Sequence, residues 1–170
     1  MPPSPFHFAR TWRVEISPER FWDTISRTDE YGTWWPWLRH FRADGLREGA
    51  TWQALIQSPL PYALRVELAL EEVVPCQRLV AAVAGDLEGL AALDLAPAAV
   101  PTPAPAVAAS VIDIEWDMRP RSRAMQVAAV VARPLLRWSH EWVLARGLEQ
   151  FQARALRTAL DDGEGNGRDQ

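Results

Sequence analysis

One stretch near the C-terminus, residues 133–160, constrains the fold of this chain more than any other. It is rich in Ala, Leu, Arg, Glu and Gln, which favour helix, and it has few breaking residues after Pro134. A helix of this length would be roughly 40 Å long, about the span of a small domain. When residues are placed at about 100° each, one side is almost entirely apolar. That side carries Leu136, His140, Val143, Leu144, Gly147, Leu148, Phe151 and Ala155.

His140 and Gly147 are the two unusual residues on this apolar side. Neither an imidazole nor a glycine adds apolar packing, so neither is expected on this side of a helix that is packed only for stability. The sequence therefore predicts that this helix is both the core of a domain and one wall of a cavity. An imidazole in that place could act as a general acid or base. A core histidine that donates to a backbone carbonyl fits the sequence equally well, so both interpretations stay open.

Short segments with apolar residues at alternate positions make up much of the remaining chain, a pattern typical of half-buried strands. The clearest is residues 62–73, where a dry face alternates with a wet one, as in an antiparallel sheet covered on one side. The other expected strands are residues 6–16, 41–44, 49–57, 78–84, 87–95 and 110–118. Arg10 interrupts the apolar row of the first strand. It either lies at a bulge or strand twist, or projects its guanidinium into a cavity.

Two short helices are expected after the first strand, over residues 19–26 and 30–35. A Ser-Pro pair precedes the first, which is a common helix start, and a proline ends the second. The second helix and its exit carry Trp34, Trp35, Trp37 and Leu38. Two short helices cannot bury so much aromatic surface between themselves, so we expect this turn to lie against a larger element.

Nine Trp among 170 residues is a high content. Each Trp combines a large apolar area with one N–H that needs a partner, so the excess suits a ligand-lined interior, although packing alone would account for it as well. The residues that we expect to contact a ligand, besides Arg10, are Trp34, Trp35, Trp37, Trp52, Tyr62, Trp116, Leu136, Val143, Gly147 and Phe151. The Tyr62 hydroxyl could close the pocket mouth or polarise a ligand carbonyl.

A sheet with one apolar face and a long amphipathic helix can bury each other. The sequence therefore predicts an α+β helix-grip fold: a curved antiparallel sheet of about seven strands wrapped around a long C-terminal helix, with two short helices after the first strand. We expect residues 1–160 to form a single ligand-binding domain and residues 161–170 a disordered polar tail. The Pro- and Ala-rich residues 96–109 are expected to form a loose connection. The gap between a curved sheet and a helix is a natural pocket.

Several short motifs, in this order along the chain, resemble the polyketide cyclase/dehydrase-like branch of the START/Bet v 1 (SRPBCC) superfamily. They are Tyr31-Gly32-Thr33-Trp34-Trp35-Pro36, Pro61-Tyr62, Gly85-Asp86-Leu87-Glu88-Gly89, Ile114-Glu115-Trp116 and Trp138-Ser139-His140. The resemblance covers roughly residues 6–155 and implies a helix-grip fold with an internal hydrophobic cavity. The superfamily includes lipid carriers, hormone receptors, aromatases and cyclases, and chaperone activators, and fold alone does not choose among them.

Composition excludes several classes of function. A net charge of −4 and a pI near 5.4 argue against a nucleic-acid surface. Cys76 is the single cysteine, the three histidines lie on different expected elements, and a zincin-like His140-Glu141 has Leu144 where the second ligand would stand, so we expect no metal and no cofactor. The N-terminus lacks the pattern of a signal peptide, and Asp94 with four nearby prolines argues against a membrane span, so we expect a cytoplasmic protein.

Binding of a hydrophobic small molecule, such as a lipid, an isoprenoid or an aromatic polyketide, is the function that these features favour. The alternative is a polyketide cyclase or dehydratase that uses His140 as general acid or base. A homodimer is a third hypothesis. It rests on a second apolar stripe of the long helix, formed by Trp138, Trp142, Leu156 and Leu160.

Overall fold

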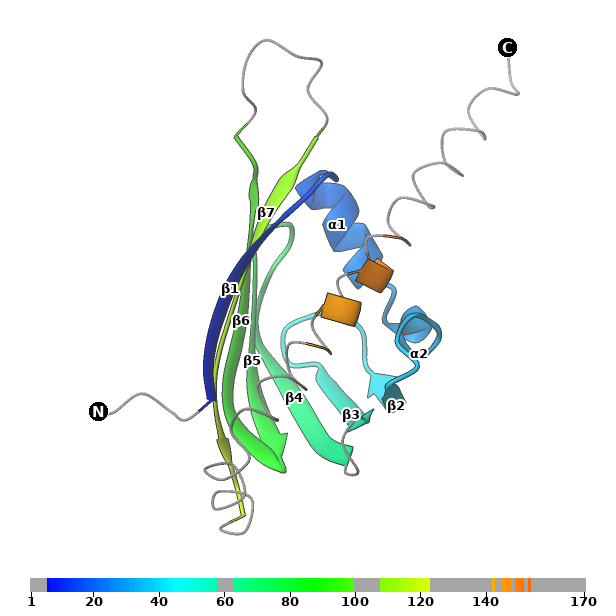
Figure 1. Cartoon of the computed structure of the whole chain (residues 1–170), viewed down its shortest axis with the longest axis vertical. Helices are drawn as coiled ribbons and strands as arrows, with labels where there is room; N and C mark the ends of the chain where they lie inside the picture. Colours follow the sequence, from blue (N-terminus) through cyan, green and yellow to red (C-terminus); the bar gives the residue numbers. More distant parts are fainter. Residues whose placement is uncertain are drawn as a thin grey trace.

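Seven strands of the described chain form one antiparallel sheet in the computed structural model of this protein (Figure 1). The structure describes residues 6–57, 63–99, 108–122, 142, 145–147, 149–151 and 153. The strands are β1 (Phe6–Val14), β2 (Leu38–Ala43), β3 (Thr51–Gln57), β4 (Ala63–Val74), β5 (Arg78–Gly85), β6 (Leu87–Pro97) and β7 (Ser110–Pro120). Their order in the sheet is β1-β7-β6-β5-β4-β3-β2, which brings the first strand beside the last.

Most strand pairs run without interruption. β1 and β7 pair from Phe6 opposite Met118 to Val14 opposite Ser110 with no register shift. β6 and β7 likewise pair up to Pro97 opposite Ser110, and Ala98 N donates to Ala109 O at 2.8 Å beyond them. The expectation of a loose connection over residues 96–109 is therefore wrong at both of its ends, and its middle, residues 100–107, lies outside the described residues.

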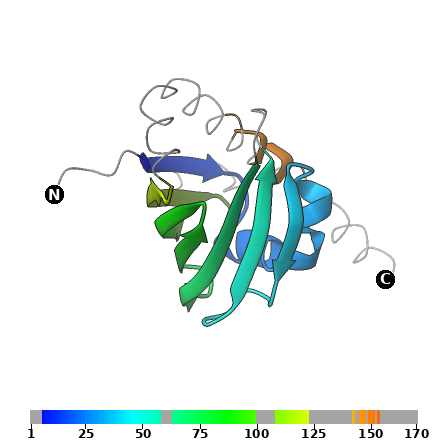
Figure 2. The ribbon, with the colours of Figure 1, turned by 90° about the horizontal axis from the view of Figure 1, so that it is seen from below.

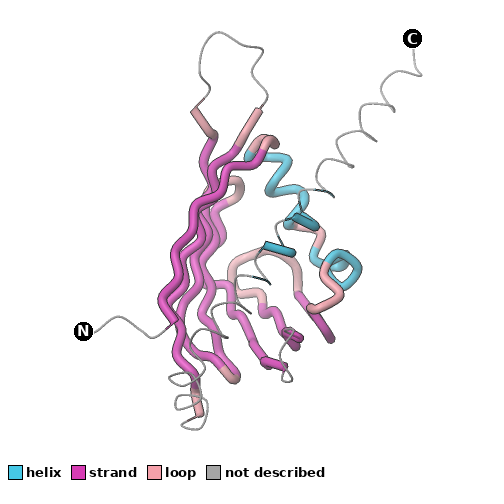
Figure 3. The backbone as a smooth tube through the Cα atoms, in the orientation of Figure 1, coloured by secondary structure: helices cyan, strands magenta, loops and turns pink. Residues whose placement is uncertain are grey.

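The sheet is curved, and the short helices all lie on one side of it (Figure 3). Figure 2 shows the same sheet from below, bent around that side. We call this side the inner face. Residues that lie opposite each other in an antiparallel pair share a face, so the register assigns inner-face positions on every strand. The predicted alternation of apolar and polar residues is the cause, because only one set of side chains can be buried against the helices.

Helix α1 (Pro18–Ile25) covers one end of the inner face. The Ser17 side chain accepts a hydrogen bond from Arg20 N at 3.3 Å and so caps the helix, as the sequence predicted. The expected second helix is divided into a 3₁₀ turn, η1 (Thr28–Glu30), and a single helical turn, α2 (Tyr31–Trp34). The chain then enters β2 at Leu38, three residues earlier than expected.

The turn between β5 and β6 is built around Gly85 and Asp86. Gly85 has a φ of +117°, and Asp86 Oδ2 accepts from Arg65 N at 2.8 Å. Asp86 also bonds through its backbone, donating to Arg65 O at 2.9 Å and accepting from Arg121 N at 3.0 Å. The hairpin predicted at this pair is confirmed, and Asp86 connects its turn to β4 and to the residue that follows β7.

Two clusters of buried residues hold the helices to the sheet. The first joins α1 to β1, β6 and β7, and the second joins α2 to β3, β4 and β5. The members of the first are Val14, Ile16, Phe21, Trp22, Ile25, Leu95, Ile112 and Phe151. The members of the second are Tyr31, Trp34, Ala50, Trp52, Leu70 and Ala81.

The long C-terminal helix is described at a few positions only. Trp142, residues 145–147, residues 149–151 and Ala153 are helical. Among them Trp142, Gly147, Gln150 and Phe151 are buried or half-buried, while Ala145, Arg146, Glu149 and Ala153 are exposed. Gly147 and Phe151 belong to the side that the sequence predicted to be apolar, so at these positions the helix faces the molecule as expected.

Candidate functional site

The inner face of the sheet is buried at one end and partly exposed toward the other. At the end that α1 covers, Val14, Leu95 and Ile112 are 2%, 5% and 1% exposed. Further along the same strands the apolar side chains of the inner face are only half-buried. These are Phe8 on β1, Ala91 and Leu93 on β6, and Ile114, Trp116 and Met118 on β7. Because the three strands keep one register, the partly exposed positions are contiguous.

A third apolar cluster continues this region across the sheet. Its buried members are Ala54, Val66 and Val83, and Leu38, Phe41, Ile56, Leu68, Ala91 and Met118 pack on them half-buried. Within the described residues, none of its members comes from α1, η1 or α2. Gly89, which has no side chain, lies opposite two of its members, Met118 and Val83. We call the half-buried residues of these two sets the open floor. They are Phe8, Leu38, Phe41, Ile56, Leu68, Ala91, Leu93, Ile114, Trp116 and Met118.

Tyr31 is the centre of the aromatic turn beside the floor. Its ring lies 4.7 Å from Trp35, 5.1 Å from Phe41, 5.4 Å from Trp34 and 5.8 Å from Trp52, measured between centroids. The Tyr31 hydroxyl donates to Ile25 O at 2.5 Å. Burial raises the pKa of Tyr31 well above its ordinary value, so the phenol stays neutral. Tyr31 was not among the residues predicted for the site, although it stands in the aromatic motif.

Trp34 and Trp52 are used in packing. They are 4% and 8% exposed, and each indole N–H has a protein acceptor. Trp52 Nε1 donates to Gly45 O at 2.8 Å. Trp34 Nε1 donates to the Glu30 carboxylate at 3.1 Å. This geometry favours the packing interpretation of both residues, and contact with a ligand stays a prediction.

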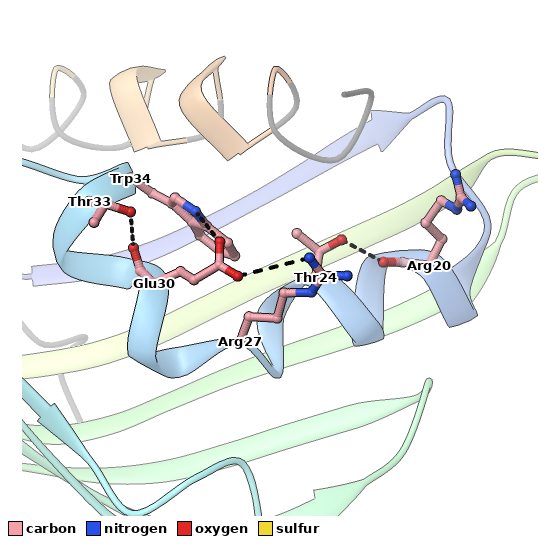
Figure 4. Close-up of polar contacts among 6 residues, drawn as sticks. All are labelled: Arg20, Thr24, Arg27, Glu30, Thr33 and Trp34. Carbon is pink, nitrogen blue, oxygen red and sulfur yellow. Dashed lines mark hydrogen bonds and ion pairs between the residues drawn. The ribbon is translucent and has the colours of Figure 1, made fainter. Parts of the chain in front are cut away.

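Glu30 connects the 3₁₀ turn to α2 and to the residue before the turn, Arg27 (Figure 4). Its carboxylate accepts from the Trp34 indole and lies 3.9 Å from the Arg27 guanidinium, while its backbone carbonyl accepts from Thr33 Oγ1 at 2.7 Å. Arg27 and Glu30 are 45% and 43% exposed, so their ion pair is a weak one. The hydrogen bond to the buried indole is the stronger contribution, because without it a buried donor would lack a partner.

Trp35 joins the aromatic turn to the C-terminal helix. Its Nε1 donates to Gly147 O at 3.1 Å. A Cβ at residue 147 would lie 3.9 Å from Trp35 Nε1 and 3.5 Å from Trp37 Cζ2. These are ordinary van der Waals distances, so the helix at Gly147 lies against two indole rings without space alone requiring a glycine there.

Trp37 and Gln150 each carry a buried polar atom that lacks a partner within the described part of the chain. Trp37 Nε1 and Gln150 Oε1 are shielded from solvent and make no hydrogen bond to any residue that the structure describes. Gln150 was not predicted for the site. Its place one helical turn after Gly147 was the available signal, since residues three apart share a helix face.

Arg10 and Trp116 lie on the open floor or at its edge. Arg10 is exposed and pairs with Ile114 in an unbroken register, which removes the bulge interpretation of its position. Its guanidinium lies 5.9 Å from the centroid of the Phe8 ring. Phe8 and Trp116 stack at 4.9 Å with an interplanar angle of 27°. One cation and two stacked rings thus share an edge of the floor.

Phe151 belongs to the core rather than to the floor. It is 4% exposed, and its ring lies 4.9 Å from that of Phe21 on α1. The predicted site residues Tyr62, Leu136, His140 and Val143 lie outside the described residues. Their roles stay predictions, and with them the assignment of a general acid or base.

Neither a metal centre nor a membrane span is found in the described part of the chain. No group of three or more His, Cys, Asp or Glu side chains there is arranged to hold a metal ion. No helix among the same residues has the length and apolar character needed to cross a bilayer.

Comparison with solved structures identifies the architecture. A START superfamily protein from Mycobacterium smegmatis superposes with a TM-score of 0.65 at 11% identity, over 89% of this chain and 98% of that one. The Zhui aromatase/cyclase from a Streptomyces species has a TM-score of 0.68 at 10% identity, over 91% and 95% of the two chains. Truncated norcoclaurine synthase from Thalictrum flavum has a TM-score of 0.62 at 10% identity, over 89% and 93%.

No family model and no curated protein matches the sequence. At this level of identity the likeness to solved structures shows the fold alone. The recognised resemblance and the predicted architecture agree with it: the chain has the helix-grip fold of the START and Bet v 1-like proteins.

Proposed function

We propose that this protein binds a hydrophobic small molecule on the open floor, between the inner face of the sheet and the C-terminal helix. The observation that carries the proposal is the change in exposure along single strands, from 1% at Ile112 to a half-buried Trp116 on the same face of β7. Removing apolar surface from water is favourable by about 25 cal/mol per Å². A bound apolar molecule would therefore be stabilised by covering the open floor, as α1 is by covering the other end of the inner face.

The chemistry of the floor indicates the class of ligand. Aliphatic and aromatic side chains dominate it, and the stacked pair of Phe8 and Trp116 offers a flat surface. Lipids, isoprenoids and aromatic polyketide-like compounds share the required apolar bulk. Arg10 adds a cation at the edge, where it would face a polar end of the ligand. A homodimer and a cytoplasmic location are not needed by this proposal and stay predictions.

Two neighbouring alanines on β6 provide the test. Ala91 lies opposite Trp116 on the inner face, and Ala92 lies opposite Glu115 on the outer face; both are half-buried. Ala91→Leu adds bulk to the floor, whereas Ala92→Leu adds the same bulk to the other side of the sheet. We expect A91L to weaken binding of the probe 1-anilinonaphthalene-8-sulfonate roughly tenfold, by removing about 1.4 kcal/mol of binding free energy.

The matched variant A92L should bind the probe as the parent protein does. Fluorescence titration measures both affinities, and thermal melts show that both variants fold. Equal loss in the two variants, or no saturable binding by the parent across a panel of apolar compounds, would contradict the proposal.

A cyclase or dehydratase is the alternative function. Two of the structural neighbours carry enzyme names, an aromatase/cyclase and a synthase, and His140 precedes Gly147 by seven residues, which is two turns of a helix. His140→Ala should then abolish turnover of a polyketide-like substrate while binding and folding remain. Unchanged turnover in that variant would remove His140 from the reaction.

A further inference from the structure

Trp37 Nε1 and Gln150 Oε1 are two buried polar atoms that have no partner among the residues that the structure describes. Buried polar groups in native proteins are nearly always hydrogen-bonded, and leaving one unpaired costs about 1–3 kcal/mol. Here one is a donor and the other an acceptor, and neither has a partner among the described residues. An unpaired donor together with an unpaired acceptor restricts the chemical group that could bind both more than either atom alone would.

Both atoms lie near the same turn of the C-terminal helix. Trp37 Cζ2, which is two covalent bonds from Nε1, is 3.5 Å from the place that a Cβ at residue 147 would occupy. Gln150 is one turn further along the same side of the helix, where side chains start about 5–6 Å from those at residue 147. A Cβ at that distance would make an ordinary van der Waals contact, so the Trp37 indole and the helix are direct neighbours here.

The indole N–H of the neighbouring Trp35, unlike that of Trp37, has an acceptor in the protein. Trp35 Nε1 donates to Gly147 O at 3.1 Å, so the protein supplies an acceptor to one of the two adjacent tryptophans and leaves the other without one. The surroundings of Trp37 are aromatic, with the ring of Trp35 at 5.9 Å. A polar pair in such surroundings discriminates strongly between ligands that match it and ligands that do not.

We propose that Trp37 and Gln150 form a polar subsite for a hydroxyl group carried by the hydrophobic ligand. A hydroxyl oxygen accepts from the Trp37 N–H, and its proton is donated to Gln150 Oε1, so one group satisfies both atoms. A carboxylate would place a charge against the Gln150 oxygen, and a bare hydrocarbon would leave both atoms unpaired. The ligand class is therefore a neutral alcohol or phenol. This inference rests on the proposed binding function.

A matched pair of probes, 2-naphthol and naphthalene, separates the hydroxyl from the ring system. The test variants are Trp37→Phe, which removes the N–H and keeps an aromatic ring, and Gln150→Leu, which removes the acceptor at similar size. Trp142→Phe and Gln53→Leu are the controls. Trp142 faces Arg146 on the helix, and Gln53 donates to Glu67 at 2.9 Å on the outer face.

Equilibrium dialysis measures the affinity of each protein for each probe. We expect W37F and Q150L each to lose roughly three- to tenfold in affinity for 2-naphthol, the equivalent of one hydrogen bond, with the affinity for naphthalene unchanged or increased. Both controls should match the parent. Q150L without ligand should melt at the same temperature as the parent or higher, because an unpaired buried group has been removed; a residue with a merely structural hydrogen bond would melt lower.

The failures of the two proposals can be told apart. If naphthalene binding is sensitive to A91L but 2-naphthol binds W37F and Q150L as it binds the parent, a water molecule alone serves the pair, and the hydroxyl subsite is overturned while the binding function stands. If neither probe binds in an A91L-sensitive manner, both proposals are overturned.

Discussion

At the residue scale, two glycines differ in whether their surroundings leave room for a side chain. A Cβ at Gly89 would lie 1.9 Å from Asp117 O, and its φ is +153°, a backbone conformation that L side chains rarely adopt. A Cβ at Gly32 in α2 would meet nothing within 4 Å. The first glycine is required by the close approach of β6 to β7, whereas the second is not required by its surroundings.

Gly89→Ala should therefore destabilise the protein by at least about 3 kcal/mol, because β6 and β7 must separate or the backbone must change. Gly32→Ala should leave stability unchanged or raise it by up to about 1 kcal/mol through helix propensity. Urea denaturation followed by tryptophan fluorescence measures both. A G89A protein as stable as the parent would show that the strands do not approach as closely as described.

At the scale of elements, the Glu30 carboxylate links η1 to α2 through the indole of Trp34. Glu30→Ala leaves the Trp34 N–H, in a residue that is 4% exposed, without its acceptor and should cost about 1–2 kcal/mol. Glu30→Gln keeps an acceptor oxygen and should retain most of that stability. Arg27→Ala removes only an exposed ion pair and should change stability by less than about 0.5 kcal/mol. Chemical denaturation of the three variants gives the order, and an R27A effect equal to that of E30A would contradict it.

Strands were predictable from the sequence because their signal is local. The alternation in β4 and the Gly85–Asp86 turn each specify an element within a few residues, and both are present in the structure. The division of the second helix into η1 and α2 was not predicted, since it depends on where Tyr31 packs against Phe41 and Trp52 from later strands. Composition and period contain no information about such contacts.

The site was predictable in part for the same reason. The place of Gly147 on the inward side follows from the pattern of one helix, but its neighbours, Trp35 and Trp37, come from a segment more than a hundred residues earlier. Whether a tryptophan packs or contacts a ligand depends on the acceptor that its N–H finds. Gly45 O accepts from Trp52, and the Glu30 carboxylate accepts from Trp34. Every residue has a backbone carbonyl, so the sequence does not indicate which one will accept from a given indole.

At the scale of the whole molecule, the absence of lysine makes alkaline unfolding simple to interpret. Two tyrosines and one cysteine are the side chains whose ordinary pKa values lie between about 8 and 11. Burial raises the pKa of Tyr31 above its ordinary value of 10.0. The unfolded chain therefore loses this proton before the folded chain does, so the stability present below pH 10 falls as the pH rises above it.

Tyr31→Phe should reduce that alkaline loss of stability. The variant gives up the hydrogen bond to Ile25 O and should be about 1 kcal/mol less stable at neutral pH, but its stability should decline less steeply above pH 10. Denaturation at a series of pH values gives the two slopes, and ultraviolet absorbance reports tyrosinate formation directly. Identical slopes in the parent and Y31F would show that Tyr31 is accessible to hydroxide in the folded state.

The pairing of β1 with β7 has a consequence for the order of assembly. Thr11 donates to Asp113 across this pair although the two residues are 102 positions apart. Closing so long a loop is entropically costly, and contacts of high sequence separation slow folding. During synthesis β1 has no partner until β7 emerges, so the Phe8–Trp116 edge of the floor is completed only when nearly the whole chain has been made. A chain truncated before β7 would leave β1 without a partner strand and would expose β6 as an edge of the sheet, available to pair with a strand of another molecule.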